Sequence, residues 1–218
     1  MQFNWLTDEK CDYLKYPRIL KKDISILKKL KINYLYLQSY KQIYSNKKST
    51  NIKKNPFGNK LCGKFRPGHF NAVVDVIDRF VKIINPKKIY LGEKDMQQLK
   101  IVEDFIKKNH IKTKVIGCKT IREKNGIACS SRNFLLSSNE KIIGSKIYFH
   151  LLDKKKSLIK KKISINTIKS IFFKLGVTKI DYIKLLDINK LILPYKKKNN
   201  YRIFIAYYLG KTRLIDNI

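Results

Sequence analysis

Three short segments of the sequence combine residue types that bind phosphate or carboxylate groups. The first runs from Cys62 to Phe70 and reads Cys-Gly-Lys-Phe-Arg-Pro-Gly-His-Phe. Its Arg66 offers a guanidinium that can hold a carboxylate or a phosphate with two hydrogen bonds. Gly68 and His69 then open a predicted helix, whose N-terminal N–H groups can bind an anion. A tight loop with a helix-capping histidine would have the same sequence, so this segment alone leaves both interpretations open.

The second segment, Gly-Glu-Lys-Asp, lies directly after a predicted strand and before a predicted helix. Ligands of open α/β sheets bind at the carboxyl ends of the strands, which is where this turn lies. Gly92 lets the backbone approach a nucleotide, Lys94 can meet a phosphate, and Asp95 can accept hydrogen bonds from ribose hydroxyls. Gln97 and Gln98 follow with neutral amides suited to hydroxyl or carboxylate groups. The alternative is that Asp95 serves only as a helix N-cap.

The third segment is Ser130-Ser131-Arg132-Asn133. Two hydroxyls and a guanidinium in one loop can clamp a polyphosphate, and arginine can stabilise the charge that develops on it. The alternative is a polar turn before a helix that begins near Ser138. A cleft lined both by this loop and by Gly92-Glu93-Lys94-Asp95, the Lys94 turn, would favour a binding function.

The elements that would position these segments follow from the spacing of apolar residues. In the first half, helices are predicted at 20–30, 69–84 and 95–108, and strands at 33–37, 89–91 and 114–118. Pro86 ends the second of these helices. A strand, a helix and a strand in this order are typical of a parallel sheet.

The second half of the chain has a different pattern. Helices are predicted at 139–162 and 167–175, and strands at 181–186 and 202–209, which together form a smaller α+β unit. We therefore expect an α/β fold with two domains, residues 1–120 and 121–218, that meet near Thr120.

The composition excludes several classes of protein. With 218 residues, of which 44% are hydrophobic, the chain can bury a core and is not a disordered polycation. It has no apolar run long enough for a signal peptide or a membrane span, which favours a cytoplasmic protein without a membrane partner. Its four cysteines and three histidines lack the spacing of zinc ligands, so reduced thiols are expected instead of a zinc site.

The formal charge of +33 raises the question of a nucleic-acid partner. The lysines are spread along the whole chain in short runs, and no zinc finger, basic heptad region or RNA-binding aromatic motif accompanies them. Lys, Ile, Asn and Tyr are all abundant, as A/T-rich codons would produce. We interpret the charge as surface lysine that arose from mutational bias, and expect no specific nucleic-acid partner.

Read together, these segments resemble the pantothenate synthetase (pantoate–β-alanine ligase) family of adenylating nucleotidyltransferases. The strings that carry the resemblance keep the family's order and are Gln2-Phe3-Asn4, Lys15-Tyr16-Pro17-Arg18, Leu61-Cys62-Gly63, Arg66-Pro67-Gly68-His69-Phe70, Gly92-Glu93-Lys94-Asp95-Met96-Gln97-Gln98-Leu99, Ile121-Arg122-Glu123, Ala128-Cys129-Ser130-Ser131-Arg132-Asn133 and Thr212-Arg213-Leu214-Ile215-Asp216-Asn217. The combination is specific, because the strings extend over the whole chain.

The resemblance implies a fold and a reaction. The fold is a Rossmann-like parallel sheet in residues 1–120, which binds nucleotide and pantoate, followed by a smaller α+β lid domain in residues 121–218. The reaction joins pantoate to β-alanine through a pantoyl-adenylate intermediate, with ATP and Mg²⁺, and releases AMP and diphosphate. The family also implies a cytoplasmic homodimer.

The resemblance also assigns roles to individual residues. Gln2, Gln98 and Arg66 would hold pantoate. Lys94 and Arg132 would be catalytic. The ATP-binding residues would be Gly92, Glu93, Lys94, Asp95, Ile121, Cys129, Ser130, Ser131 and Arg132, with Ile121 contacting adenine through its backbone. The sequence does not identify the Mg²⁺ ligands.

The sequence departs from the family at its beginning. The family opens with a strand, a Met-Gly-x-Leu-His-x-Gly-His turn, a helix and a second strand that ends in Asn-Pro-Met-Gln-Phe, and none of this precedes Gln2. A late start site, an upstream frameshift and a shortened gene would all produce this pattern. We expect the parallel sheet to be N-terminally truncated, and the chain expressed from Met1 to aggregate and to be nearly inactive. The alternatives are an inactive remnant and a basic nucleic-acid-binding protein on the same scaffold.

Overall fold

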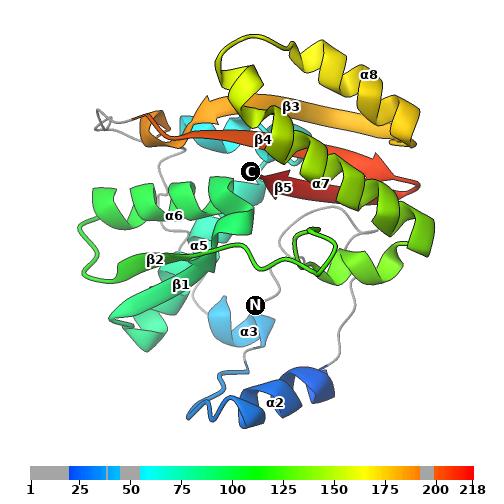
Figure 1. Ribbon diagram of the computed structural model, residues 1–218. Helices are drawn as coiled ribbons and strands as arrows, with labels where there is room; N and C mark the ends of the chain where they lie inside the picture. Colours follow the sequence, from blue (N-terminus) through cyan, green and yellow to red (C-terminus); the bar gives the residue numbers. More distant parts are fainter. Residues whose placement is uncertain (1–19, 38, 45–54, 192–198) are drawn as a thin grey trace.

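The computed structural model describes residues 20–37, 39–44, 55–191 and 199–218 (Figure 1). The helices are α2 (Leu20–Lys29), α3 (Tyr40–Ile43), α4 (Cys62–Phe65), α5 (His69–Ile84), α6 (Met96–Lys108), α7 (Ser138–Ile159) and α8 (Ile165–Leu175). The strands are β1 (Lys88–Gly92), β2 (Lys114–Cys118), β3 (Lys179–Asp187), β4 (Tyr201–Leu209) and β5 (Thr212–Asn217). Short 3-10 turns occupy η2 (Pro56–Asn59), η3 (Glu93–Asp95), η4 (Ser131–Leu135) and η5 (Ile188–Lys190).

The first half contains the predicted parallel β–α–β unit. Strands β1 and β2 pair in parallel, from Lys88 opposite Lys114 to Gly92 opposite Cys118. Helices α5 and α6 pack on one face of this pair through a buried apolar cluster that consists of Val73, Ile77, Val81, Val102 and Ile106. The amphipathic stripe of α5 therefore has the role that its spacing predicts, and Asn85, in the left-handed conformation at φ 46°, ends the helix before Pro86.

One expected strand is absent. Residues 33–37 form no strand in the structure and are exposed, and Tyr34 is 93% exposed. Alternating Tyr and Leu residues have a high strand propensity, but a strand also needs a neighbour to complete its backbone hydrogen bonds. None of the described residues provides such a neighbour.

The second half is an antiparallel sheet in the order β3-β4-β5, covered by α7 and α8 (Figure 1). Residues on one face of the sheet, such as Ile203 and Ile205, pack against these helices in a large core. Residues on the other face, Phe204 and Ala206 among them, pack against the first half. Because β4 is buried on both faces, its sequence is almost continuously hydrophobic.

The two halves share a core. One buried cluster joins Phe57, Phe70 and Leu99 from the first half to Tyr182 and Phe204 from the second. This packing brings the carboxyl end of β1 close to β5. The boundary at Thr120 stays a prediction.

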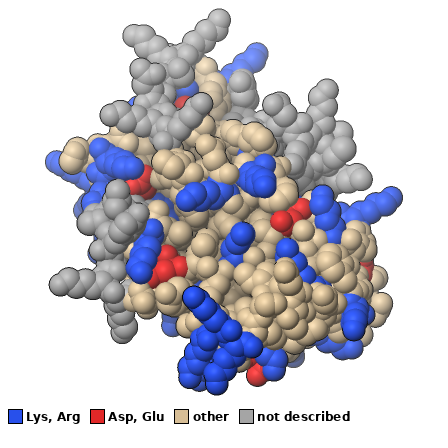
Figure 2. Space-filling model, turned by 90° about the horizontal axis from the view of Figure 1, so that it is seen from above, with Lys and Arg blue, Asp and Glu red and all other residues tan. Residues whose placement is uncertain are grey.

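Figure 2 shows one face of the molecule, on which most Lys and Arg side chains are scattered with uncharged surface between them, apart from one denser group at the lower edge. No helix in the described part of the chain is long and apolar enough to cross a membrane.

Candidate active site

The Lys94 turn lies at the carboxyl end of β1, between the parallel sheet and helix α6. Lys94 is mostly buried, with 18% of its side chain exposed, and its Nζ lies 3.8 Å from the carboxylate of Asp95. At the preceding Gly92, φ is −69° and an added Cβ would meet no atom within 4 Å. Glycine is therefore not needed there for the fold of the described residues, but it leaves the backbone open to a ligand.

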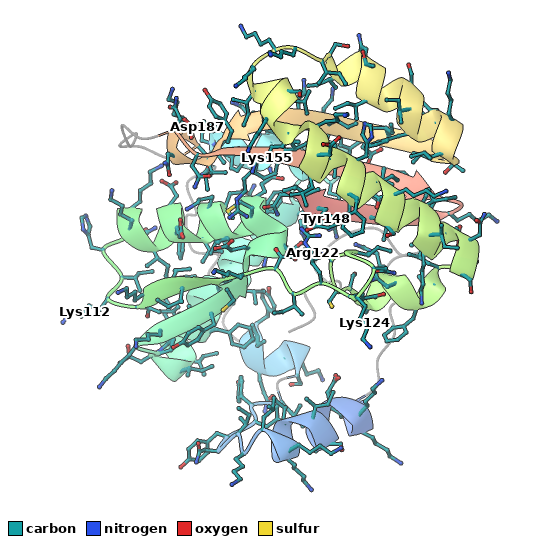
Figure 3. The ribbon with its side chains drawn as sticks, in the orientation of Figure 1. Lys112, Arg122, Lys124, Tyr148, Lys155 and Asp187 are labelled. Carbon is teal, nitrogen blue, oxygen red and sulfur yellow. The ribbon has the colours of Figure 1, made fainter. Side chains whose placement is uncertain are left out.

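A loop from the second half faces this turn. Arg122 donates to both carboxylate oxygens of Asp216 at 2.6 and 3.1 Å and to the carbonyl of Gly126 at 3.0 Å. Its guanidinium also stacks on the ring of Tyr148 at 4.1 Å (Figure 3). Burial lowers the pKa of Arg122, but the hydrogen bond to Asp216 and the negative charge of Asp216 together outweigh it, so the pKa is raised and the side chain stays a cation. Arg122 thus ties the loop to β5 and α7.

The same loop presents Ser130 and Arg132. The Ser130 hydroxyl accepts a hydrogen bond from the backbone N–H of Arg132 at 3.2 Å and so caps η4. The buried amide of Asn133 donates to the Glu123 carboxylate at 2.6 Å and to the Ala128 carbonyl at 3.1 Å. These bonds tie the segment that carries Ser130 and Arg132 to the preceding part of the loop, and so fix its conformation.

Two adjoining cavities lie where the Lys94 turn, this loop and β5 meet. Both are lined by Lys94, Arg132, Arg213, Ile215 and Asp216. The larger cavity, which is open to solvent, also contains Arg66, Asp95 and Gln98. The smaller one also contains Ser130 and Asn133.

The larger cavity has an excess of positive charge. It is lined by four cations, Arg66, Lys94, Arg132 and Arg213, and by the two carboxylates of Asp95 and Asp216. Arg66 lies next to the first turn of α5, where its Nη1 is 3.3 Å from Nε2 of His69. Guanidinium and ammonium groups in one partly enclosed space are suited to phosphates and carboxylates.

Arg213 and its neighbours were not singled out as site residues by sequence reasoning. Arg213 donates to Asp181 at 2.8 Å and lies 3.8 Å from the sulfur of Cys62, which in turn lies 2.9 Å from the Tyr182 hydroxyl. Burial lowers the pKa of Arg213, but Cys62 and Asp181 together raise it by more, so the side chain stays a cation. The hydrogen bond to Asp181 holds this cation at the cavity wall. Burial, followed by Cys62, raises the pKa of Tyr182. The only signal in the sequence was the Thr-Arg-Leu-Ile-Asp-Asn string, which carried no assigned role.

The structure brings together six of the twelve predicted site residues. Arg66, Lys94, Asp95, Gln98, Ser130 and Arg132 line one or both cavities. Their individual roles stay predictions.

The other predicted site residues do not line these cavities. They are Gly92, Glu93, Ile121, Cys129 and Ser131. Glu93 instead accepts from Arg202 at 2.8 Å, and the Ile121 carbonyl accepts from the N–H of Cys129 at 2.9 Å. Gln2 lies outside the described residues.

Gln97 has a structural role that its neighbour Gln98 does not share. Its amide donates to the carbonyls of Phe57 and Lys60 at 2.8 and 2.6 Å, and its oxygen accepts from the N–H of Cys62 at 3.1 Å. These three bonds hold the 57–62 loop against α6. Because both amide hydrogens are used in them, Gln97 has none left to donate to a ligand.

A family profile described as Pantoate-beta-alanine ligase matches residues 1–218. Pantothenate synthetase of Clostridium botulinum (strain ATCC 19397 / Type A) is 38% identical over 212 residues, which cover 95% of this chain and 75% of that protein. Pantothenate synthetase of Sulfurihydrogenibium sp. (strain YO3AOP1) is 33% identical over 216 residues, which cover 95% of this chain and 76% of that protein.

Solved structures show the same likeness. The pantoate-β-alanine ligase of Francisella tularensis, complexed with β-γ ATP and β-alanine, superposes with a TM-score of 0.80 at 35% identity, over 98% of this chain and 74% of that one. Pantothenate synthetase of Thermus thermophilus superposes with a TM-score of 0.82 at 26% identity, over 98% of this chain and 79% of that one. These likenesses confirm the predicted fold class, a Rossmann-like α/β sheet followed by a smaller α+β unit. Because the family profile matches the whole chain and the relatives are this similar, the chain belongs to the pantoate–β-alanine ligase family.

Proposed function

We propose that this chain catalyses the ATP-dependent condensation of pantoate with β-alanine to pantothenate, with release of AMP and diphosphate. One observation supports the proposal above the others. Four cations from both halves of a family member line one cavity, in which a carboxylate and a polyphosphate could be held together. The ligase of Francisella tularensis was solved with an ATP compound and β-alanine, the two partners that pantoate requires in this reaction.

The chemistry follows from the charges that must be stabilised. The pantoate carboxylate attacks the α-phosphorus of ATP, a P–O bond to diphosphate breaks, and pantoyl adenylate forms. Negative charge grows on the phosphoryl oxygens as diphosphate leaves, and Lys94 from the first half of the chain and Arg132 from the second half offset it. The amine of β-alanine then attacks the acyl carbon, AMP leaves, and the amide of pantothenate is complete.

The pantoate end of the cavity uses other side chains. Arg66 is suited to hold the pantoate carboxylate until it attacks, and the Gln98 amide can bind a pantoate hydroxyl. Arg213, fixed by Asp181, adds a cation that cannot move far from the wall. Orientation of the two reactants in this way contributes to the rate because the attack becomes effectively unimolecular.

Mg²⁺ is part of the same proposal, as the ion that accompanies ATP. Among the described residues, no group of three His, Cys, Asp or Glu side chains could hold a metal on its own. Mg²⁺ in nucleotide sites commonly takes one or two carboxylates together with phosphate oxygens. Asp95, half exposed in the cavity beside Lys94, fits that role, and the ion would supply positive charge to the phosphates.

Assembly and location are proposed from the family resemblance. We propose a homodimer, and a cytoplasmic location, where ATP is available to the reaction. Analytical ultracentrifugation tests the first, with a mass of twice 25.8 kDa as the expected result.

The reaction is tested by pantothenate formation with purified chain, pantoate, β-alanine, ATP and Mg²⁺. The chain expressed from Met1 is expected to turn over slowly, but the product that it forms should require all three substrates. Lys94→Gln should lower kcat/KM at least about 100-fold, the usual loss when one transition-state contact is removed. Lys112→Gln is the matched control, because Lys112 is exposed at the opposite end of the parallel sheet (Figure 3). A folded chain that forms no product, or a Lys94→Gln variant as active as the control, would contradict the proposal.

A further inference from the structure

The Thr-Arg-Leu-Ile-Asp-Asn string forms strand β5, and its last residue reaches across to the Lys94 turn. The side chain of Asn217 is buried, with 3% of the residue exposed. Its Nδ2 donates to the carbonyl of Glu93 at 2.8 Å and to the carbonyl of Lys94 at 2.9 Å. One amide nitrogen carries two hydrogens, so each carbonyl receives one of them.

The orientation of this amide is set by Arg202 on β4. The Nη1 of Arg202 donates to Oδ1 of Asn217 at 2.7 Å, and Nη2 donates to the carboxylate of Glu93 at 2.8 Å. Arginine only donates and carbonyl oxygens only accept, so the amide of Asn217 has a single orientation that satisfies every partner. Arg202, Glu93 and Asn217 therefore form a closed network around the turn.

The turn needs support from outside. It is a single 3-10 turn of three residues, Glu93–Asp95, and no side chain caps its beginning. Such a turn has few hydrogen bonds of its own and poorer geometry than an α-helix. The two carbonyls that Asn217 holds belong to the peptide units on either side of the Lys94 Cα, so they determine the direction in which the Lys94 side chain leaves the backbone.

We propose that Asn217, oriented by Arg202, is a positioning residue that holds the Lys94 turn in the geometry required for adenylation. The inference rests on the proposed function, in which Lys94 contacts the phosphates. It also assigns a role to the second half of the chain beyond covering the site. Strand β5 supplies part of the support for a group that belongs to the first half.

The test uses Asn217→Asp, which keeps the size and the acceptor for Arg202 but replaces the donor with a carboxylate that faces two carbonyls. Asn109→Asp is the matched control, because Asn109 also donates its amide to a backbone carbonyl, that of Phe105, at the far end of α6. Hydrogen exchange of the 92–98 amides, measured by mass spectrometry on the free protein, reports the turn directly. The kinetic readouts are kcat/KM for ATP and KM for β-alanine.

Asn217→Asp should accelerate exchange in the 92–98 peptide and lower kcat/KM for ATP, each by roughly 30-fold, or about fivefold for each hydrogen bond lost. KM for β-alanine should stay within about twofold, which a general loss of structure would not allow. Unchanged exchange in this peptide overturns the inference. A wild-type chain without pantoate-dependent activity overturns the proposed function instead, while the exchange result still decides whether Asn217 holds the turn.

A second variant keeps the test decisive if Asn217→Asp fails to fold. Glu93→Gln keeps the size of the side chain and removes the charge that pairs with Arg202, at a position where 25% of the side chain is exposed. It should accelerate exchange and lower kcat/KM for ATP by about fivefold. No change in either quantity would overturn the inference.

Discussion

The ion pair between Arg122 and Asp216 should contribute more to the free energy of unfolding than an ion pair between residues one turn apart in a helix. Removal of one partner from a buried ion pair costs about 3–5 kcal/mol. Here the two side chains are 19% and 12% exposed, so solvent screens part of the charge left behind. We expect Arg122→Met to lower the free energy of unfolding by about 2–3 kcal/mol, including the stacking on Tyr148.

A double-mutant cycle with Arg122→Met and Asp216→Asn isolates the pair from the other contacts of each residue. The expected coupling energy is about 2 kcal/mol, because the pair is bidentate and joins elements 94 residues apart. Urea unfolding followed by circular dichroism gives the four stabilities. The matched control is Arg79 and Asp75, whose side chains are 13% and 19% exposed but lie one helical turn apart, and whose coupling should be about 0.5 kcal/mol. Equal coupling energies for the two pairs would refute the reasoning.

Three further predictions concern other parts of the molecule. Burial raises the pKa of Tyr207, so the stability that comes from its bound proton is present below about pH 10 and is lost above it by up to about 1.4 kcal/mol per pH unit. The urea midpoint of Tyr207→Phe should therefore fall less between pH 10 and 11 than that of the wild type. Equal falls in the two proteins would exclude this cause. Gly126→Ala should destabilise by about 2 kcal/mol or more in thermal unfolding, because φ is +87° and the new Cβ would lie 2.3 Å from the ring of Tyr148. Phe172→Ala should cost about 3–5 kcal/mol in urea unfolding, since Phe172 is fully buried between α8 and the second sheet, and a loss below 1 kcal/mol would contradict the packing described.

Helices with a strong apolar stripe and clear end signals could be predicted from the sequence almost to the residue. Helix α5 begins at His69 and ends at Ile84, as its pattern indicates. This helix is determined by local periodicity and by Pro86, so its prediction needs no knowledge of its neighbours. The wrong strand at 33–37 has the opposite cause, because strand formation depends on a partner that the local pattern does not reveal.

Strand β5 and its contacts could not be predicted, for a related reason. Its Arg213, Asp216 and Asn217 interrupt the apolar alternation that identifies a strand. Each of these side chains forms hydrogen bonds with a partner more than 30 residues away in sequence. Arg213 pairs with Asp181, Asp216 with Arg122, and Asn217 with the Lys94 turn. The chemistry of the candidate site was therefore visible in Lys94 and Arg132, whereas the groups that hold those residues in place were not.

The contact between Asn217 and Glu93 also has a consequence for the order of folding. It joins residues that are 124 positions apart, whereas α5 and α6 are built from bonds between residues four positions apart. Closing so long a loop costs conformational entropy before any contact compensates for it, so local elements form first and such contacts form late. The Lys94 turn should thus acquire its final geometry only when β5 joins the sheet. A nucleotide that recognises this geometry would bind the finished protein and not its folding intermediates, and would so favour completion of the fold.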